Sequence, residues 1–228
     1  ARLIHVAIEI GGYGFLLPMY VTVAHRMFPF FAANVVRGYV AWRPLAWLAV
    51  FWIGALLHLA LEMSHAYAWL WLPDVPLLAL SVWWLYRAGV WRGAPPLLRV
   101  LFAGFAWLPL SLLLHAVQSA WFAATDQFIL GRAPDHALFV GFFGSLLVAM
   151  VTRVTQGHSG RMLELGRIAG FAFVAIQCVA VLRVAAEVMP DAPAWQAAAA
   201  LGWLLAFLPW VLRSAFIYLT PRADGEPG

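Results

Sequence analysis

The sequence has 228 residues, of which 64% are hydrophobic and only 11% are charged, and its mean hydropathy is +0.85. Soluble domains contain roughly 25% charged residues, so this composition excludes a soluble protein and predicts an integral membrane protein surrounded by a lipid bilayer. The pI of about 9.7 comes from arginines in short loops, as membrane topology predicts, and does not indicate nucleic-acid binding. A single cysteine, Cys178, excludes an internal disulfide and a Cys-rich metal or iron–sulfur site.

Seven apolar segments reach the length that crosses a membrane, which is about 20 helical residues. They lie near residues 3–24, 43–63, 67–86, 98–122, 136–156, 167–189 and 196–219. The third segment contains Pro73, Asp74 and Pro76, and we expect a broken or kinked helix there. Residues 1–220 are therefore predicted to form one all-α transmembrane helical bundle, followed by a disordered tail at 221–228.

The arginines alternate between the two ends of the predicted spans. The loops after the second and sixth spans contain none, and the loop after the fourth contains only Arg132. The loops after the first, third and fifth spans are rich in arginine: Arg26, Arg37 and Arg43; Arg87, Arg92 and Arg99; and Arg153, Arg161 and Arg167. By the positive-inside rule, we expect the N-terminus to be periplasmic and the C-terminus to be cytoplasmic.

Five histidines and two carboxylates are expected to gather near the outer membrane face. At about 1.5 Å per residue, His58 lies ~22 Å past Arg43, and His115 lies ~24 Å past Arg99. His136 opens the fifth span at its outer end. The other members flank the same ends of the first and second spans: His5, Glu9, Glu62 and His65.

Ionisable side chains within spanning segments usually face the bundle interior and are candidates for functional sites. Imidazole also binds haem iron, copper and zinc. The outer cluster therefore predicts a haem or metal centre, with these candidate metal ligands: His136, His115, His58, His65, Glu62 and His5. Copper suits one helix end in particular, because nitrogen, oxygen and soft sulfur donors are combined there in His58, Glu62, Met63 and His65. The alternative is a set of interfacial histidines that are hydrogen-bonded between helices.

A second, cationic group is expected at the cytoplasmic end. The stretches HRMFPFF (25–31) and TRVTQGHSGR (152–161) bring five side chains to a similar depth: His25, Arg26, Arg153, His158 and Arg161. Guanidinium groups bind carboxylates and phosphates in bidentate geometry, so this group suits haem propionates or an anionic lipid head group. The alternative is plain anchoring of the helix ends by positive charge.

His136 and His158 lie at opposite ends of the fifth span. A continuous helix separates them by about 33 Å, the full hydrocarbon thickness, so we expect them to belong to different sites. Between them, small residues recur at every fourth position: Ala137, Gly141, Ser145 and Ala149. Such a stripe favours close packing of a neighbouring helix, or a groove for a flat macrocycle beside His136.

The stretch HALFVGFFGSLLVAMVTRVTQGHSGR (136–161) resembles the signature segment of the NnrS family, which reads close to HALTVGxxGxxxLxVMTRxxxGHTGR. Two further stretches, HRMFPFFAANVV (25–36) and FAGFAWLPLSLLL (102–114), resemble the family patterns RxxPFFxxN and GYxWLPLxLLL. The sequence departs from the signature at Phe139, Phe142 and Ser159. Family members have about twelve spans and an early HAHE-type motif, which the His5/Glu9 pair resembles. The chain is therefore expected to be the C-terminal part of such a protein.

The resemblance implies a haem- and copper-containing protein of the bacterial inner membrane that is linked to denitrification and to protection against nitrosative stress. It implies b-type haem and copper as cofactors, and nitric oxide or a related small ligand as a partner. A redox partner or a second copy of the chain is a further expectation. The residues expected to bind the cofactor are His136, His115, His58, His158, Arg153, Arg161, His25 and Arg26.

Three functions remain open from the sequence. The first is a haem- and copper-binding protein that binds, senses or detoxifies nitric oxide. The second is a transporter or export factor for metal, haem or a nitrosylated complex. The third is a non-catalytic membrane subunit of a redox complex. Hydrolase chemistry is not expected, because the chain contains no pattern of a nucleophile triad or a phosphate-binding loop, and whether the protein is an enzyme stays open.

Overall fold

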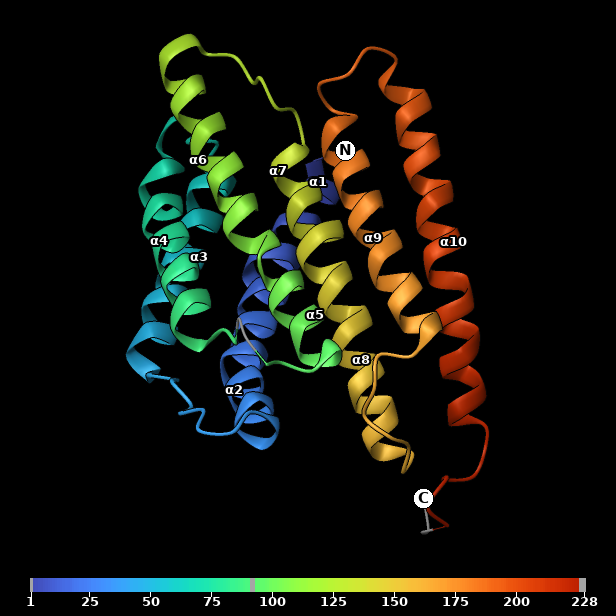
Figure 1. Cartoon of the computed structure of the whole chain (residues 1–228). Coiled ribbons are helices and arrows are strands. Elements are labelled where there is room, and N and C mark those ends of the chain that lie inside the picture. Colours follow the sequence, from blue (N-terminus) through green and yellow to red (C-terminus); the bar gives the residue numbers. More distant parts are fainter. Residues whose placement is uncertain (1, 91–92, 226–228) are drawn as a thin grey trace.

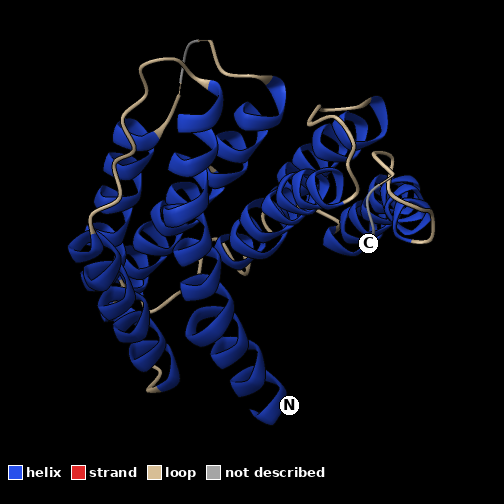
Figure 2. Ribbon diagram, turned by 90° about the horizontal axis from the view of Figure 1, so that it is seen from below, coloured by secondary structure: helices blue, strands red, loops and turns tan. Residues whose placement is uncertain are grey.

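A computed structural model of the chain describes residues 2–90 and 93–225, with the side chains of Arg2 and His5 outside the described part. All regular elements in these ranges are helices (Figure 2). Seven helical spans in the described ranges are long and apolar enough to cross a membrane, which confirms the predicted all-α bundle. The sidedness of the termini stays a prediction.

The first span runs without a break from α1 (Arg2–Glu9) through a π-helix, η1 (Ile10–Leu16), into α2 (Leu17–Val35). The predicted end near residue 24 is therefore wrong, and HRMFPFF is helix rather than loop. The physical reason is that the buried face continues past Arg26 through Phe28, Phe31 and Ala32. Pro29 stays within α2, as spanning helices allow where neighbouring groups satisfy the freed backbone carbonyl.

The third span is not broken at its prolines. After α3 (Leu45–Met63), a 3-10 turn, η2 (Tyr67–Trp69), leads into a continuous helix, α4 (Trp71–Ala88). Pro73 falls in the first turn of α4, where a missing N–H leaves no helical hydrogen bond unmade. Asp74 follows it and is fully buried, at 0% exposure, so the polar residue that interrupts the apolar pattern lies inside the bundle.

The remaining predicted spans agree with the structure to within a few residues. The fourth contains α5 (Pro96–Phe105) and α6 (Trp107–Thr125), and the sixth and seventh are α9 (Arg167–Ala185) and α10 (Ala192–Tyr218). The fifth contains a short α7 (Ala133–His136), a second π-helix, η3 (Ala137–Gly144), and α8 (Ser145–His158). His136 and His158 therefore lie at opposite ends of one helical span, as the sequence predicts.

The helices pack as neighbouring pairs around the fifth span. α4 packs on α6, α5 on α8 and α9 on α10, while η3 contacts both α6 and α9. In Figure 1 the fifth span stands between α6 and α9, and Figure 2 shows α10, marked by the C-terminus, at one side of the bundle. The core is aromatic, with the rings of Trp84 and Phe105 only 4.5 Å apart. Leu204 and Leu212 on α10 are exposed, as suits a face in contact with lipid.

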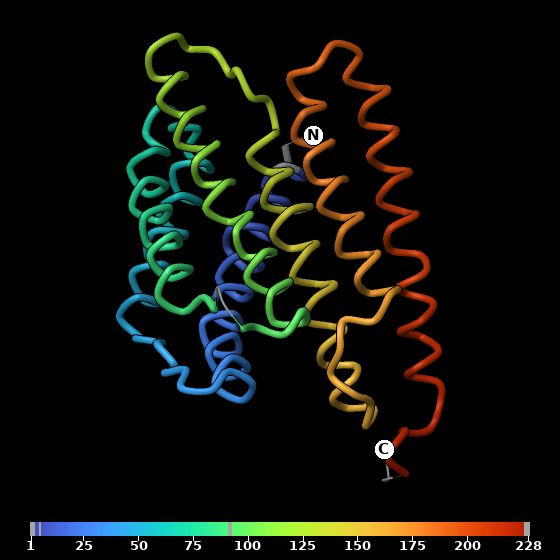
Figure 3. Tube along the Cα trace, viewed as in Figure 1, coloured from blue at the N-terminus to red at the C-terminus, as the bar shows by residue number. Residues whose placement is uncertain are grey.

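The two termini lie at opposite ends of the bundle (Figure 3), and we name these the N-terminal end and the C-terminal end. The sequence predicts a disordered tail at 221–228, of which the structure describes residues 221–225. The backbone N–H of Ala223 donates to the carbonyl of Ser159 at 2.9 Å, so this part of the tail contacts the end of α8.

The close approach of the fifth span to α6 leads to a first prediction. A Cβ atom added at Gly141 would overlap the ring of Trp107, whereas one added at Gly157 in the same span meets only Leu163, at 3.9 Å. Gly141→Ala should therefore overpack the interface and destabilise the protein by about 1–3 kcal/mol. Thermal unfolding in detergent checks this, with Gly157→Ala as the control. Equal unfolding temperatures for both variants would contradict the packing.

Candidate functional site

Five ionisable or hydrogen-bonding side chains meet inside the bundle near its N-terminal end. We call this group the histidine cluster: Tyr13, His58, Asp74, His115 and Asp135. Each comes from a different element, namely η1, α3, α4, α6 and α7. Tyr13, His58, Asp74 and His115 are each at most 7% exposed. A polar group of this kind inside an apolar bundle is a functional-site candidate, because burial without full hydrogen bonding is unfavourable.

The centre of the cluster is the pair formed by His58 and Asp74. Their Nδ1 and Oδ1 atoms lie 2.6 Å apart, and the side chains are 1% and 0% exposed. The outer atoms of the same two groups, His58 Nε2 and Asp74 Oδ2, are buried without a hydrogen-bond partner. With the Nδ1–H of a neutral His58 donated to Asp74, the lone pair is on Nε2. This arrangement is the one in which proteins hold a metal-ligating histidine, with the second ring nitrogen bound to a carboxylate.

A second hydrogen-bonded chain runs beside that pair. The Tyr13 hydroxyl donates to Asp135 Oδ1 at 2.9 Å and lies 2.6 Å from His115 Nε2. Because the single hydroxyl proton goes to Asp135, the tyrosine oxygen is left to accept the N–H of His115. Tyr13 also stacks on His58 with ring centroids 4.3 Å apart, and His58 meets His115 edge to face at 5.0 Å. The two histidines are thus fixed relative to each other through one tyrosine.

A cavity of about 950 Å³ opens beside the cluster. Its volume is at the upper end of the range typical of small-molecule and cofactor sites. The ionisable lining residues are Glu9, Glu62, Tyr67, His115, Arg132, Asp135 and His136. Ile4, Ile8 and Phe139 add apolar wall, so the cavity combines hydrophobic surface with polar groups.

The structure places the predicted metal ligands in different surroundings. His58 and His115 belong to the histidine cluster, and Glu62 lines the cavity. His65 is exposed, with Nδ1 lying 2.7 Å from the Tyr67 hydroxyl. The side chain of His5 lies outside the described residues. Within the described part of the chain, no set of three or more His, Cys, Asp or Glu side chains is arranged to hold a metal ion, so the copper set predicted at the end of α3 is not preassembled.

His136 is tied to the loop after α9 rather than to the histidine cluster. Its Nε2 lies 3.2 Å from Glu187 Oε1, and Arg183 donates to the same oxygen at 2.9 Å. The backbone N–H of Arg132 donates to the other carboxylate oxygen at 3.1 Å. Glu187 therefore joins the start of the fifth span to the end of the sixth, while the imidazole of His136 still forms part of the cavity wall.

The five side chains of the predicted cationic group have different surroundings. His25 Nε2 lies 3.2 Å from the carbonyl of Pro44, and the ring stacks on Trp47. Arg153 lies over the ring of Phe31 at 3.9 Å. Of the other three, Arg26 and His158 are exposed, and Arg161 lines a cavity near the C-terminal end.

The stripe of small residues in the fifth span is a packing surface. Ala137, Gly141, Ser145 and Ala149 are all buried. Trp107 occupies the space in front of Gly141, and the Ser145 hydroxyl accepts a hydrogen bond of 2.6 Å from Gln177 of α9. Of the two interpretations of the stripe, the described residues favour helix packing over a groove for a macrocycle.

Sequence reasoning missed four residues that the structure brings to this region: Tyr13, Asp74, Asp135 and Glu187. Asp74 has a signal in the sequence, because an acidic residue inside a spanning segment is a functional candidate by itself. From the sequence it is taken only as an interruption of the third span. The pairing of Tyr13 with Asp135, which are far apart in the sequence, has no local signal.

The fold and the cluster together define a multi-pass helical membrane protein with a buried polar site. The sequence model of one family, described as NnrS protein, matches residues 1–222. The chain therefore belongs to the NnrS family of bacterial membrane proteins and is related to nitric oxide metabolism. Comparisons with curated proteins and with solved structures gave no match.

The contacts of Glu187 predict a pH dependence of stability. Burial alone would raise the pKa of this carboxyl, but the N–H of Arg132 and the charges of His136 and Arg183 outweigh it and lower the pKa below 4.5. A carboxylate with a lowered pKa stabilises the folded state at neutral pH, and this contribution is lost as the pH falls through the folded-state pKa. Unfolding temperatures of the wild type and of Glu187→Gln should differ by a few degrees at pH 7 and converge in acid. A constant difference across that range would contradict the assignment.

Proposed function

We propose that this protein holds a redox cofactor, haem in the first place, at the histidine cluster and uses it in the bacterial response to nitric oxide. The response includes protection against nitrosative stress and denitrification, and the bacterial inner membrane is the proposed location. The observation that supports this most directly is His58, a buried imidazole whose Nδ1 is bonded to Asp74 and whose Nε2 has no partner. The chemistry matches a protein that must hold iron or copper through a neutral histidine.

The residues present fit haem better than a closed copper site. A copper centre with three or more protein ligands needs a preassembled donor set, and the described residues contain none. Haem needs one or two axial nitrogens together with an apolar, shaped space. His58 offers such a nitrogen but does not line the cavity, whereas His115, whose ring centroid lies 5.0 Å from that of His58, does. The cavity of about 950 Å³ has a partly apolar wall. Copper stays in the proposal, but the described residues do not preassemble a ligand set for it.

The surrounding side chains have defined tasks in this proposal. Asp74 accepts a hydrogen bond from the Nδ1–H of His58 and so fixes both the tautomer and the orientation of the ring. Tyr13 stacks on His58 and, through its hydroxyl, ties His115 to Asp135. The burial of these groups keeps water away from the Nε2 lone pair of His58. Bound haem would supply an iron centre able to bind nitric oxide or to transfer an electron.

Partners follow from the same proposal. Nitric oxide or a related small, weakly polar molecule is the proposed ligand, and it can reach the cluster from the bilayer or through the cavity. Electron transfer at the cluster would require a redox partner, which is either a separate protein or a second copy of this chain. The experiments below separate these functions from transport and from a purely structural role.

Cofactor analysis of the detergent-purified full-length protein tests the proposal. We expect a pyridine haemochrome signal and a Soret band that shifts on addition of nitric oxide. His58→Gln, which keeps the approximate side-chain size, should lose most of the band while the protein still elutes as a folded species. His65→Gln, an exposed histidine at the end of the same helix, should retain it.

Three results, from cofactor analysis, vesicle transport and co-purification, would count against the proposal. Absence of both haem and copper from the purified wild type would contradict the proposal. Ligand-dependent uptake or export in vesicles without a stoichiometric cofactor would indicate a transporter. Co-purification of a redox enzyme whose activity is unaffected by His58→Gln would indicate a non-catalytic subunit.

Asp74→Asn separates a positioning role of Asp74 from a merely structural one. Asparagine keeps the shape and can still accept the Nδ1–H of His58 through its amide oxygen, but it removes the carboxylate that makes the imidazole more basic. Loss of such a partner typically lowers metal affinity by about 10–100-fold. We therefore expect weaker retention of the cofactor and a shifted reduction potential, measured by spectroelectrochemistry. An unchanged potential in a variant that folds normally would assign Asp74 a structural role only.

A further inference from the structure

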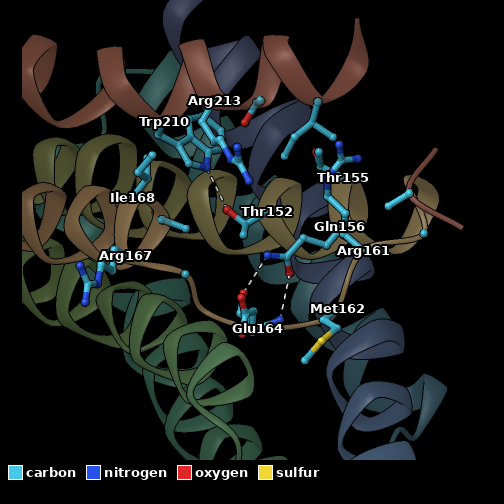
Figure 4. Close-up of a pocket in the computed structure, with 16 residues that line it drawn as sticks. Thr152, Thr155, Gln156, Arg161, Met162, Glu164, Arg167, Ile168, Trp210 and Arg213 are labelled. Carbon is cyan, nitrogen blue, oxygen red and sulfur yellow. Dashed lines mark hydrogen bonds between the residues drawn. The ribbon is translucent and has the colours of Figure 1, made fainter. Parts of the chain in front are cut away.

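A second cavity, of about 790 Å³, lies near the C-terminal end of the bundle, remote from the histidine cluster. It is enclosed by the end of α8, the connection between α8 and α9, the start of α9 and the last part of α10 (Figure 4). No residue of the histidine cluster lines this second cavity.

The cavity wall is cationic. The lining includes three arginines, Arg161, Arg167 and Arg213, and one acidic residue, Glu164, which leaves a net charge of +2. The backbone N–H and carbonyl of Glu164 are both held by the side chain of Gln156, at 3.2 and 2.8 Å (Figure 4), and its side chain is exposed. Asp224, which packs beside Gly160, is paired with Arg222 at 2.9 Å. Arg167 and Arg213 are exposed as well, and Arg161 is half-buried, so the lining as a whole is net positive.

Arg161 has unused donor capacity. Its Nη2 donates to the Thr220 hydroxyl at 3.3 Å, whereas its Nη1 is buried without a hydrogen-bond partner. A buried charged donor without an acceptor is unfavourable, so an oxygen-rich anion beside Arg161 would be stabilised. Two threonines also line the wall: Thr152 accepts a hydrogen bond from the indole N–H of Trp210, and Thr155 shares one with the hydroxyl of Tyr218.

The start of α9 adds a second source of positive potential. Gly166 to Ala169 line the cavity, and the N-cap Gly166 provides no side-chain cap. The first hydrogen bond within the helix is that of Gly170 N–H to Gly166, at 2.8 Å, so the three preceding N–H groups lie before it. The N-terminus of a helix attracts anions, phosphate in particular, through these N–H groups and the helix dipole.

The other part of the wall is apolar. Ile168, Trp210 and Ile217 line the cavity together with Met162, which is exposed. A wall that combines arginines with aliphatic and aromatic groups matches an amphiphile that has an anionic head and a hydrocarbon part. The predicted sidedness places this end at the cytoplasmic leaflet, where phosphate head groups are available.

We propose that this cavity binds a phosphate ester anion, with the head group of an anionic phospholipid as its source and the acyl chain against Ile168, Trp210 and Ile217. The bound phosphate bridges Arg161, Arg213 and the start of α9, and so joins the sixth and seventh spans to the end of α8. The inference is independent of the cofactor site, because no residue of the histidine cluster contributes to it.

Lipid-dependent thermal stability of the purified full-length protein tests this site. Phosphatidylglycerol should raise the unfolding temperature of the wild type in a saturable way, whereas phosphatidylcholine should not. In Arg161→Gln/Arg213→Gln the half-saturating phosphatidylglycerol concentration should rise at least tenfold. Arg99→Gln removes an exposed arginine of α5 outside the cavity and should behave as the wild type does.

Inorganic phosphate identifies the source of the ligand. If phosphate alone stabilises the wild type, and the double variant abolishes the effect, the site takes the same anion from solution rather than from lipid. Equal stabilisation of the wild type and the double variant by phosphatidylglycerol would overturn the proposal.

If the double variant fails to fold, Ser214→Asp tests the same site. This substitution places a negative charge in the same wall at a half-buried position and should weaken phosphatidylglycerol binding. Unchanged binding in this variant would also overturn the proposal.

Discussion

The hydrogen bond between His58 and Asp74 is the constraint on which the arrangement of the bundle interior depends. Two polar groups that are almost fully buried in an apolar bundle must be well paired, because an unpaired group is strongly unfavourable in a medium of low dielectric constant. Only one atom of each group is paired within the described residues. The remaining atoms, His58 Nε2 and Asp74 Oδ2, have no partner there, and this is the observation that supports the proposed cofactor site.

The two π-helices contain or adjoin two members of the histidine cluster, Tyr13 and Asp135. η1 carries Tyr13, and η3 begins directly after Asp135 and His136. A π-helix inserts an extra residue into a turn and re-aims the side chains next to it, and such segments are common at functional sites. Both π-helices also contain glycines at points of close approach, with Gly12 beside Phe139 and Gly141 beside Trp107. The same segments thus turn polar side chains inward and bring the helices close together.

Two chemically different groups of side chains result at opposite ends of one bundle. The histidine cluster combines imidazoles with carboxylates, whereas the cavity near the C-terminal end is lined by three arginines and one glutamate. The fifth span extends from one to the other, with Asp135 and His136 at its start and Thr152 and Thr155 near its end. Its buried stripe of small residues fits it to α6 and α9 along the way.

The sequence by itself determined the class, the number of spans and the gathering of histidines at one end, because composition, apolar length and helical rise are local properties of the chain. It also indicated the family, through the stretch that begins at His136. Only the tertiary structure decided which histidines belong to the histidine cluster. His58 is hydrogen-bonded to Asp74 within the cluster, whereas His136 is paired with Glu187 outside it. The partners come from different helices. They meet because each helix has a particular rotation about its own axis in the bundle, and no local sequence pattern determines that rotation. The depth of a residue in the membrane can be estimated from its position along the sequence, whereas the direction in which its side chain points depends on how the helices pack.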